Sequence, residues 1–250
     1  MTLNVSHLTG GYYQKEVISD IHFTINPGEI VALIGLNGAG KSTIIRHIMG
    51  VLKPFSGSVT INKDSTNLRE ADYFKSIGYI PETPLLYEEL TLKEHIELTA
   101  ISHDLSPEEA LKRAESLLKI FRLENYLDWF PVDFSKGMKQ KVMVICALII
   151  KPKVLIIDEP FIGLDPLAMN DLIHLIEDAK NQGTAILMST HVLANVQKMC
   201  DRMIILDGGR ILSQGTYSDI AKRFNIKSNS LDTLFLEVLD VNRNVVKSHA

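Results

Sequence analysis

A glycine-rich stretch, Gly35-Leu-Asn-Gly-Ala-Gly-Lys41-Ser42-Thr43, limits what this chain can fold into more than any other feature. It follows an apolar run, Glu29 to Ile34, that predicts a buried strand, and it leads into Lys41 to Met49, whose apolar spacing is helical. Glycines let the backbone wrap closely around an anion, and the N–H groups at the start of a helix point at it. The stretch fits G-x-x-x-x-G-K-[ST] in the strand–loop–helix context that this pattern requires, so it predicts a phosphate loop.

Each part of the phosphate loop has a predicted role. We expect the Lys41 ammonium to meet the β and γ oxygens of a nucleotide, and the Ser42 hydroxyl to be a ligand of Mg²⁺. The phosphates would be held by the whole loop, which consists of Gly35, Leu36, Asn37, Gly38, Ala39, Gly40, Lys41, Ser42 and Thr43. Such a loop does not by itself separate kinases, GTPases and motor ATPases. Asn62-Lys63-Asp64-Ser65 misses the Asn-Lys-x-Asp base reader of GTPases by one position, and we interpret it as a turn.

A second apolar run, Val154 to Ile157, ends in two adjacent carboxylates, Asp158 and Glu159. Neighbouring side chains of a strand face opposite sides, so the two acids can do different jobs. Asp158 is placed to hold Mg²⁺, and Glu159 to polarise an attacking water. The alternative is a buried strand that merely ends in surface acids.

Ser135-Lys136-Gly137 opens the helix before that strand. Serine is a good N-cap, so capping alone is one interpretation. An exposed Ser and Gly at a helix N-terminus also form an anion site, which is the other.

Taken together, these motifs resemble the nucleotide-binding domain of ABC ATPases over nearly the full chain. The order is the phosphate loop, the Ser-x-Gly helix start, the Asp158-Glu159 strand end, Gly163-Leu164-Asp165, and then Ser189-Thr190-His191 after another strand. The segments 80–91 and 129–141 resemble most closely the ATPase subunit of Ecs-type ABC transporters of Gram-positive bacteria.

The resemblance implies further roles. Tyr12 would stack on adenine, with Tyr13 as the alternative. Ser135 and Gly137 would reach the γ-phosphate of ATP bound to a second subunit. Asp165 would lie in the loop that links the two sites across the dimer, and His191 would be the switch histidine that contacts the γ-phosphate. The other histidines form no pair with metal-ligand spacing and are interpreted as structural or solvated; they are His7, His22, His47, His95, His103, His174 and His249.

Two positions depart from the family pattern. The usual Leu-Ser-Gly-Gly-Gln signature is replaced by Phe134-Ser-Lys-Gly-Met138, in which the Ser and the second Gly remain. Similar Ser-Lys-Gly-Met forms occur among bacterial exporter-type ATPases. Glu82 stands where the family has a Gln that binds Mg²⁺ and relays to the membrane subunit. Either Mg²⁺ absorbs the extra charge of Glu82, or this side chain turns away when nucleotide is bound.

Composition and patterning predict the fold class. The chain is 46% hydrophobic and 22% charged with a net charge of −4, which suits a globular protein and excludes a large basic field for nucleic acid. Strands alternating with helices predict an α/β fold with a parallel sheet. The resemblance implies a P-loop NTPase of the ABC type, with an N-terminal antiparallel β subdomain and an inserted α-helical subdomain at about 85–150. We expect one ABC ATPase domain over 1–225 and a C-terminal extension, a polar tail, over 226–250.

The expected function is Mg-dependent ATP hydrolysis that powers a membrane ABC transporter of the exporter type. The start of the chain shows no signal peptide, and its most apolar run, Val142 to Ile150, is shorter than the roughly 20 residues a bilayer requires. The resemblance implies a separate integral membrane permease, a second copy arranged head to tail, and a cytoplasmic place on the inner face of the membrane. The alternative is a soluble ABC ATPase in a non-transport assembly, such as an iron–sulfur scaffold or a regulatory complex.

Overall fold

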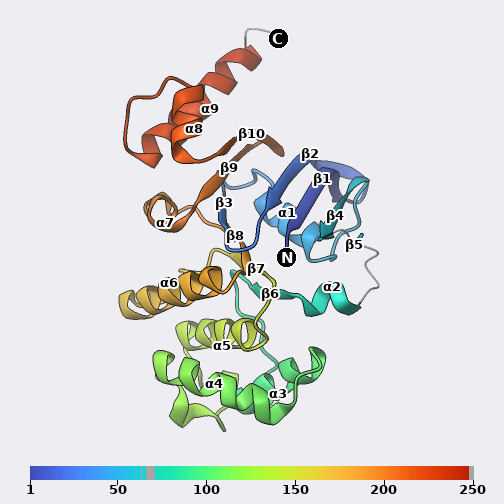
Figure 1. The fold of residues 1–250 in the computed structure, drawn as a ribbon, viewed down its shortest axis with the longest axis vertical. Coiled ribbons are helices and arrows are strands. Elements are labelled where there is room, and N and C mark those ends of the chain that lie inside the picture. Colours follow the sequence, from blue (N-terminus) through green and yellow to red (C-terminus); the bar gives the residue numbers. More distant parts are fainter. Residues whose placement is uncertain (63, 66–70, 248–250) are drawn as a thin grey trace. The chain divides into compact units, whose positions relative to one another are not determined.

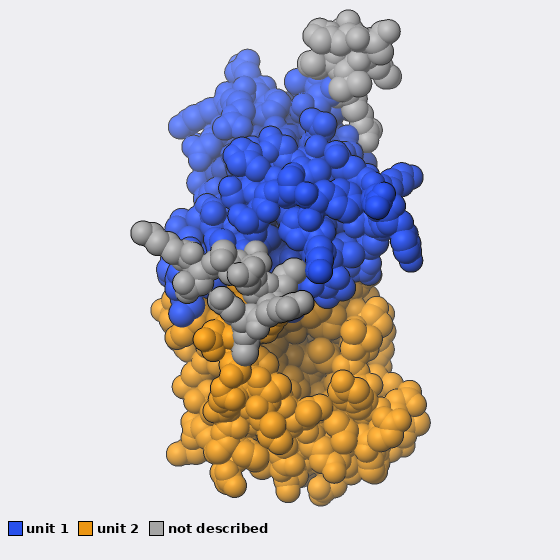
Figure 2. Space-filling view, turned by 90° about the vertical axis from the view of Figure 1, so that its right-hand side faces the viewer, with its two compact units in different colours: residues 1–70, 185–250 blue, residues 71–184 orange. Residues whose placement is uncertain are grey.

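The computed structural model describes residues 1–62, 64–65 and 71–247, which form two compact units. Unit 1 comprises residues 1–70 and 185–250, and unit 2 comprises residues 71–184 (Figure 2). The predicted boundary between an ATPase domain and an extension at residue 225 stays a prediction.

The first sheet of unit 1 is antiparallel, as predicted for the N-terminal subdomain, with the strand order β2-β1-β4-β5. Its strands are β1 (Leu3–Tyr12), β2 (Lys15–Ile25), β4 (Ser56–Ile61) and β5 (Asp64–Ser65). Tyr13 and Gln14 join β1 to β2 with φ of 48° and 64°, the positive values that a type I′ hairpin turn requires. A turn was predicted over residues 62–65, but Asp64 and Ser65 form β5, which pairs with β4; Lys63 lies outside the described residues.

The second sheet of unit 1 carries the phosphate loop. β3 (Ile30–Gly35) pairs in parallel with β8 (Ala185–Ser189) and β9 (Arg202–Asp207), and β10 (Arg210–Gly215) pairs antiparallel with β9. All of β3 is buried, because an interior parallel strand is covered on both faces. Helices α1 (Lys41–Ile48) and α7 (Leu193–Met199) follow β3 and β8 respectively. The predicted parallel pairing is confirmed.

Two C-terminal helices complete unit 1, and here one expectation is wrong. α8 (Tyr217–Arg223) and α9 (Leu231–Lys247) pack against β10, and α9 also packs against α7 (Figure 1). Residues from 226 onward were expected to form a polar tail, yet α9 has a buried apolar stripe. Its members join the same core cluster as Ile34 and Ile205 of the sheet; they are Leu231, Leu234, Phe235, Val238 and Leu239.

Unit 2 contains the predicted helices and the apolar strand that ends at Asp158. Helices α3 (Leu92–Ser102), α4 (Pro107–Phe121) and α5 (Lys136–Ile149) pack against one another (Figure 1). β6 (Ile77–Ile80) and β7 (Val154–Asp158) pair in parallel. The remaining elements are α2 (Ala71–Lys75), α6 (Pro166–Asn181) and two short 3₁₀ helices, η1 (Glu124–Tyr126) and η2 (Pro131–Asp133). Over the described ranges of the chain, no helix is long and apolar enough to span a membrane.

Candidate functional site

The phosphate loop leaves the carboxyl end of β3 and turns tightly into α1. Ala39 N–H donates to the Leu36 carbonyl at 3.1 Å. Gly38 and Gly40 adopt φ of 80° and 107°, which side chains other than glycine rarely allow. A Cβ on Gly40 would also lie 2.8 Å from Cγ2 of Ile18. Both the conformation and the space therefore demand glycine at position 40.

Lys41 and Ser42 are the first two residues of α1. The Lys41 ammonium donates to the carbonyl of Gly35 at 2.8 Å and to that of Leu36 at 3.4 Å, and the residue is 8% exposed. An ammonium has three donors and no acceptor. Here two carbonyls of the loop itself accept hydrogen bonds from it. Ser42, on the first turn of α1, is exposed. A buried cation and a helix N-terminus at one loop suit an anionic group such as a phosphate.

His191 lines a pocket with the start of the phosphate loop. β3 and β8 are parallel, with Leu33 paired to Ser189, so their carboxyl ends lie at the same edge of the sheet. His191 comes just after β8 and is exposed. The pocket measures about 300 Å³, and its lining residues are Gly35, Leu36, Asn37, Thr190, His191, Leu193 and Phe235. The structure thus brings the predicted switch histidine to the predicted phosphate loop.

Phe235 of α9 is a lining residue that the sequence analysis missed. It is buried, at 7% exposure, and belongs to the apolar stripe of α9. The helical spacing of Leu231, Leu234, Phe235 and Val238 is the pattern that could have revealed it.

Tyr12 ends β1 and contacts the helix that follows the phosphate loop. Arg46 of α1 donates from Nη1 to the Tyr12 hydroxyl at 2.8 Å, and its guanidinium carbon lies 5.8 Å from the centre of the tyrosine ring. Tyr12 is half-buried, whereas Tyr13 is fully exposed in the hairpin turn. The stacking of either ring on adenine stays a prediction.

In unit 2, Asp158 is the last residue of β7, and Glu159 follows it directly. Asp158 is 6% exposed at the end of a wholly buried strand. Glu159 has φ of 48°, a left-handed conformation. Such backbone costs on the order of 1–3 kcal/mol outside glycine and persists where the surroundings enforce it, often at functional sites. The turn therefore gives the two neighbouring carboxyl groups different environments.

The start of α5 packs against the loop before α6. Ser135 caps α5, since its Oγ accepts from Met138 N–H at 3.2 Å, so the capping interpretation is confirmed as one of its roles. A Cβ on Gly137 would lie 2.7 Å from the Gly163 carbonyl oxygen, which makes glycine necessary for this approach. The Ser-x-Gly and Gly-Leu-Asp motifs are thereby neighbours in unit 2.

Asp165 caps α6. Its Oδ1 accepts from the N–H groups of Leu167 at 3.0 Å and Ala168 at 2.9 Å, and Nζ of Lys141 lies 3.6 Å from its Oδ2. The bond from Ala168 N–H, with the charge of Lys141 and the bond from Leu167, lowers the pKa of the Asp165 carboxyl. The sequence analysis assigned Asp165 a role only by resemblance and did not foresee the cap.

Glu82 is exposed in the loop after β6. The preceding carbonyl, of Pro81, accepts from Nε2 of Gln140 at 3.1 Å. Gln140 lies on α5 and is 1% exposed. This glutamine was not singled out from the sequence, although it lies two residues after the Phe134–Met138 motif.

Comparison with known proteins gives a consistent result. The family model described as ABC transporter matches residues 18–162. The ABC-type transporter ATP-binding protein EcsA of Bacillus subtilis (strain 168) is 51% identical, over 94% of this chain and 96% of that protein. A solved structure of the ATP-binding subunit of an ABC transporter is 48% identical with a TM-score of 0.92, covering 96% of this chain and all of that one.

A third relative is informative about nucleotide. It is a dimeric ATP-binding cassette in a post-hydrolysis state, bound to ADP and Pi. It is 26% identical with a TM-score of 0.77, over 86% of this chain and 98% of that one. The predicted fold class, with its antiparallel β subdomain and helical insertion, is confirmed, as is the resemblance to Ecs-type ATPases. The chain belongs to the ABC transporter family, as an ATP-hydrolysing subunit that powers a transporter.

Proposed function

We propose that this ATPase hydrolyses Mg-ATP with the phosphate loop, Asp158, Glu159 and His191 acting on the same nucleotide. The observation that carries the proposal is the Lys41 ammonium, bound at 2.8 Å to the Gly35 carbonyl inside a loop whose pocket is also lined by His191. A phosphate entering this loop would replace neutral carbonyl partners of Lys41 with charged oxygens, which form stronger hydrogen bonds.

Each residue then has a role in hydrolysis. Residues 35–43 hold the phosphates, and the imidazole of His191 contacts the terminal one. Glu159 accepts the proton of the water that attacks the γ-phosphorus, while the bond from this phosphorus to the ADP oxygen breaks. Tyr12 stacks on adenine. Because the base must accept a proton at a fixed position, the left-handed turn at Glu159 supports its assignment.

The residues present also fit Mg²⁺. The exposed Ser42 hydroxyl and the Asp158 carboxylate are oxygen donors of the kind that Mg²⁺ prefers. Ser42 and Asp158 would hold the ion, with Glu82 as a further candidate. When bound, Mg²⁺ supplies positive charge that offsets the charge of the phosphates.

We further propose that two copies close head to tail. Ser135 and Gly137 then reach the γ-phosphate held by the partner copy, and Asp165 links the two sites. Support comes from the packing of the two motifs in unit 2, where Gly137 meets Gly163 and Lys141 meets Asp165. These contacts hold the Ser-x-Gly and Gly-Leu-Asp segments beside each other.

The partner on the membrane side is proposed to be a permease encoded as a separate chain, which places this subunit at the inner face of the cell membrane. Unit 2 exposes large apolar side chains that suit such a partner. They are Leu85, Tyr87, Leu98, Ile101, Trp129, Phe130 and Val132, and Val132 is 72% exposed. A hydrogen bond from Leu92 N–H to the Trp129 carbonyl, 3.0 Å long, joins two of the segments that carry them. The Ser-Lys-Gly-Met form at α5 supports export as the direction.

Purification from membranes in mild detergent tests the partner. We expect a multi-spanning protein to accompany the subunit, and a Trp129→Glu, Val132→Glu double variant to lose it. Leu236→Glu is the matched control, because Leu236 is a 58% exposed apolar residue of unit 1. Recovery of the parent subunit without any membrane protein, or equal recovery from the parent and the double variant, would contradict the proposed docking.

A further inference from the structure

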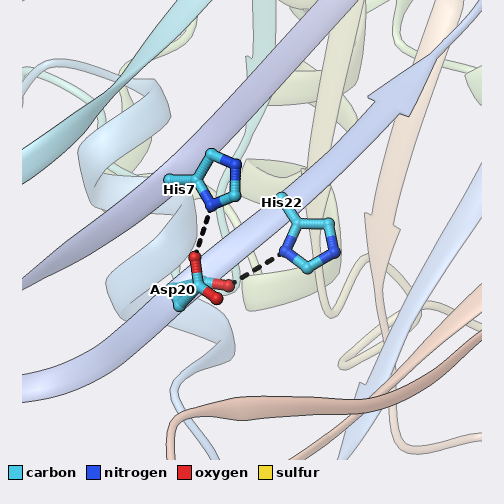
Figure 3. A group of neighbouring side chains, drawn as sticks. All are labelled: His7, Asp20 and His22. Atoms are coloured by element: carbon cyan, nitrogen blue, oxygen red, sulfur yellow. Dashed lines mark hydrogen bonds and ion pairs between the residues drawn. The ribbon is translucent and has the colours of Figure 1, made fainter.

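Two histidines and an aspartate gather on the exposed face of the β1–β2 hairpin. His7 lies on β1, and Asp20 and His22 lie on β2 (Figure 3). Each offers one potential metal-ligand atom, and these three atoms lie within 4.8 Å of one another. Tetrahedral zinc, with ligands at about 2.0–2.1 Å, keeps its ligand atoms about 3.3 Å apart. All three side chains are exposed, so solvent rather than packing surrounds them and their rotamers can adjust to an ion.

An irregular stretch of the hairpin produces this gathering. The pairing of β1 with β2 shifts register between Val5 and Leu8, so His7 lies in a bulge. His7 and Asp20 adopt φ of 46° and 52°. The N–H group of Asp20 donates a hydrogen bond to Oγ1 of Thr9 at 3.1 Å. A regular hairpin would direct alternate residues to opposite faces, whereas the bulge lets His7 meet Asp20.

Two oxygen atoms of Asp20 accept hydrogen bonds from the imidazoles and fix which ring nitrogen carries the proton. Its Oδ1 lies 2.6 Å from Nδ1 of His7, and its main-chain carbonyl lies 3.1 Å from Nδ1 of His22 (Figure 3). A carbonyl oxygen only accepts, so Nδ1 of His22 carries the proton. A carboxylate also only accepts, so Nδ1 of His7 carries the proton of its bond to Asp20. An imidazole with its one proton on Nδ1 keeps the lone pair of Nε2.

We propose that His7, Asp20 and His22 form a site for a divalent transition-metal ion of the zinc type. Each histidine binds through a ring nitrogen and Asp20 through a carboxylate oxygen, one ligand atom from each of the three residues. Metal-binding histidines characteristically donate their other N–H to a carboxylate or a backbone carbonyl, and Asp20 supplies one of each. Imidazole nitrogen suits Zn²⁺, Cu²⁺ and Ni²⁺, whereas Mg²⁺ prefers oxygen. The site is thus chemically distinct from the magnesium position proposed beside the phosphate loop.

Metal at this site would tie β1 to β2. The ion binds the folded hairpin and not the separated strands, so it stabilises unit 1 against unfolding. Tyr12 lies on β1, at the end of the same hairpin, which the ion would make more rigid.

The test is titration of the full chain, without an affinity tag or nucleotide, with Zn²⁺ alone in a calorimeter, paired with thermal unfolding. We expect one zinc per chain and a raised Tm. His22→Gln and His7→Asn should each abolish this binding, and Asp20→Asn should weaken it by about 10- to 100-fold. Asparagine tolerates positive φ, so the changes at positions 7 and 20 spare the backbone.

The matched control is His174→Gln. His174 is also an exposed histidine beside a carboxylate, with Nδ1 3.6 Å from Oε2 of Glu177, but among the described residues it belongs to no group of three potential metal ligands. It should leave zinc binding unchanged. All variants should retain the parent's Tm in the presence of a chelator, which shows that they fold. If zinc fails to bind the parent, or binds His22→Gln and His7→Asn as tightly as the parent, the site does not exist.

Discussion

Gln140 donates a hydrogen bond from Nε2 to the main-chain carbonyl of Pro81 over 3.1 Å, and so joins α5 to the loop that carries Glu82. Gln140 is 1% exposed, and among the described residues its Oε1 is buried with no hydrogen-bond partner. An unsatisfied buried acceptor costs free energy. A displacement of the Pro81 carbonyl would also remove the hydrogen bond of Gln140, so this side chain connects the loop of Glu82 to α5.

Glu82→Gln tests the position at which this chain departs from its family. Two unit charges about 4 Å apart interact by roughly 4 kcal/mol at an effective dielectric of 20, before Mg²⁺ offsets any of it. We expect the variant to bind Mg-ATP more tightly or to raise basal hydrolysis, while stimulation by the membrane partner falls. The measurement is ATP affinity at several Mg²⁺ concentrations, with and without that partner. Glu88→Gln, at another exposed acid of the same loop, is the control. Parent-like behaviour of Glu82→Gln in both settings would make Glu82 a solvated loop acid.

Mixing two inactive variants tests the head-to-tail dimer. Ser135→Arg blocks the Ser-x-Gly surface, and Lys41→Ala removes the phosphate-loop cation. A mixed dimer should contain one intact composite site, so nucleotide occlusion should reappear only on mixing. Ser135→Thr, which keeps the helix cap, should occlude nucleotide by itself. Equal occlusion in the mixed and separate samples would rule out sites shared between copies.

Two leucines of α9 test whether this helix belongs to the folded core. Leu234 is fully buried in the cluster of unit 1, whereas Leu236 is 58% exposed. Leu234→Ala should lower the free energy of unfolding by about 2–5 kcal/mol. Leu236→Ala should change it by no more than about 0.5 kcal/mol. Urea denaturation measures both, and equal effects would show that the helix is not packed as described.

The cap at Asp165 predicts a pH dependence. Its folded pKa is lowered, first by the Ala168 N–H bond, so its ionised form stabilises the fold. This contribution is present above the unfolded pKa, about 3.9, and is lost as the pH falls through the lower folded pKa. Asp165→Asn keeps a capping side chain without the charge. The parent should be more stable than this variant at pH 7, and the difference in urea midpoint should shrink towards pH 3. A difference that is constant or grows in acid would contradict the cap's charge.

Local patterns were sufficient to predict much of the fold. β3 and β7 are continuous apolar runs of the length of a strand, and Ser106-Pro107 marks the start of α4, where Ser106 Oγ accepts from Glu109 N–H. The phosphate loop was predictable because its spacing encodes its backbone conformation. The apolar stripe of α9 was present in the sequence too, but the polar residues between its members obscured it.

Contacts between distant segments could not be predicted in this way. No local pattern shows that Gly137 must make room for the Gly163 carbonyl, or that Gln140 reaches Pro81. His7 and His22 lack metal-ligand spacing along the chain, and His7 comes to Asp20 where the pairing of β1 with β2 shifts register. In each case tertiary packing, rather than residue type, creates the relationship.

Glu159→Gln tests the central claim most directly. Glutamine keeps the size and hydrogen-bonding capacity of Glu159 but cannot accept the proton of the attacking water. Steady-state ATP hydrolysis by the subunit should fall by at least about 100-fold, while ATP affinity is kept and a closed dimer accumulates. Glu124→Gln, at an exposed acid of unit 2, should hydrolyse ATP at the parental rate. Near-normal hydrolysis by Glu159→Gln would contradict the account, because Glu159 would then not be the base.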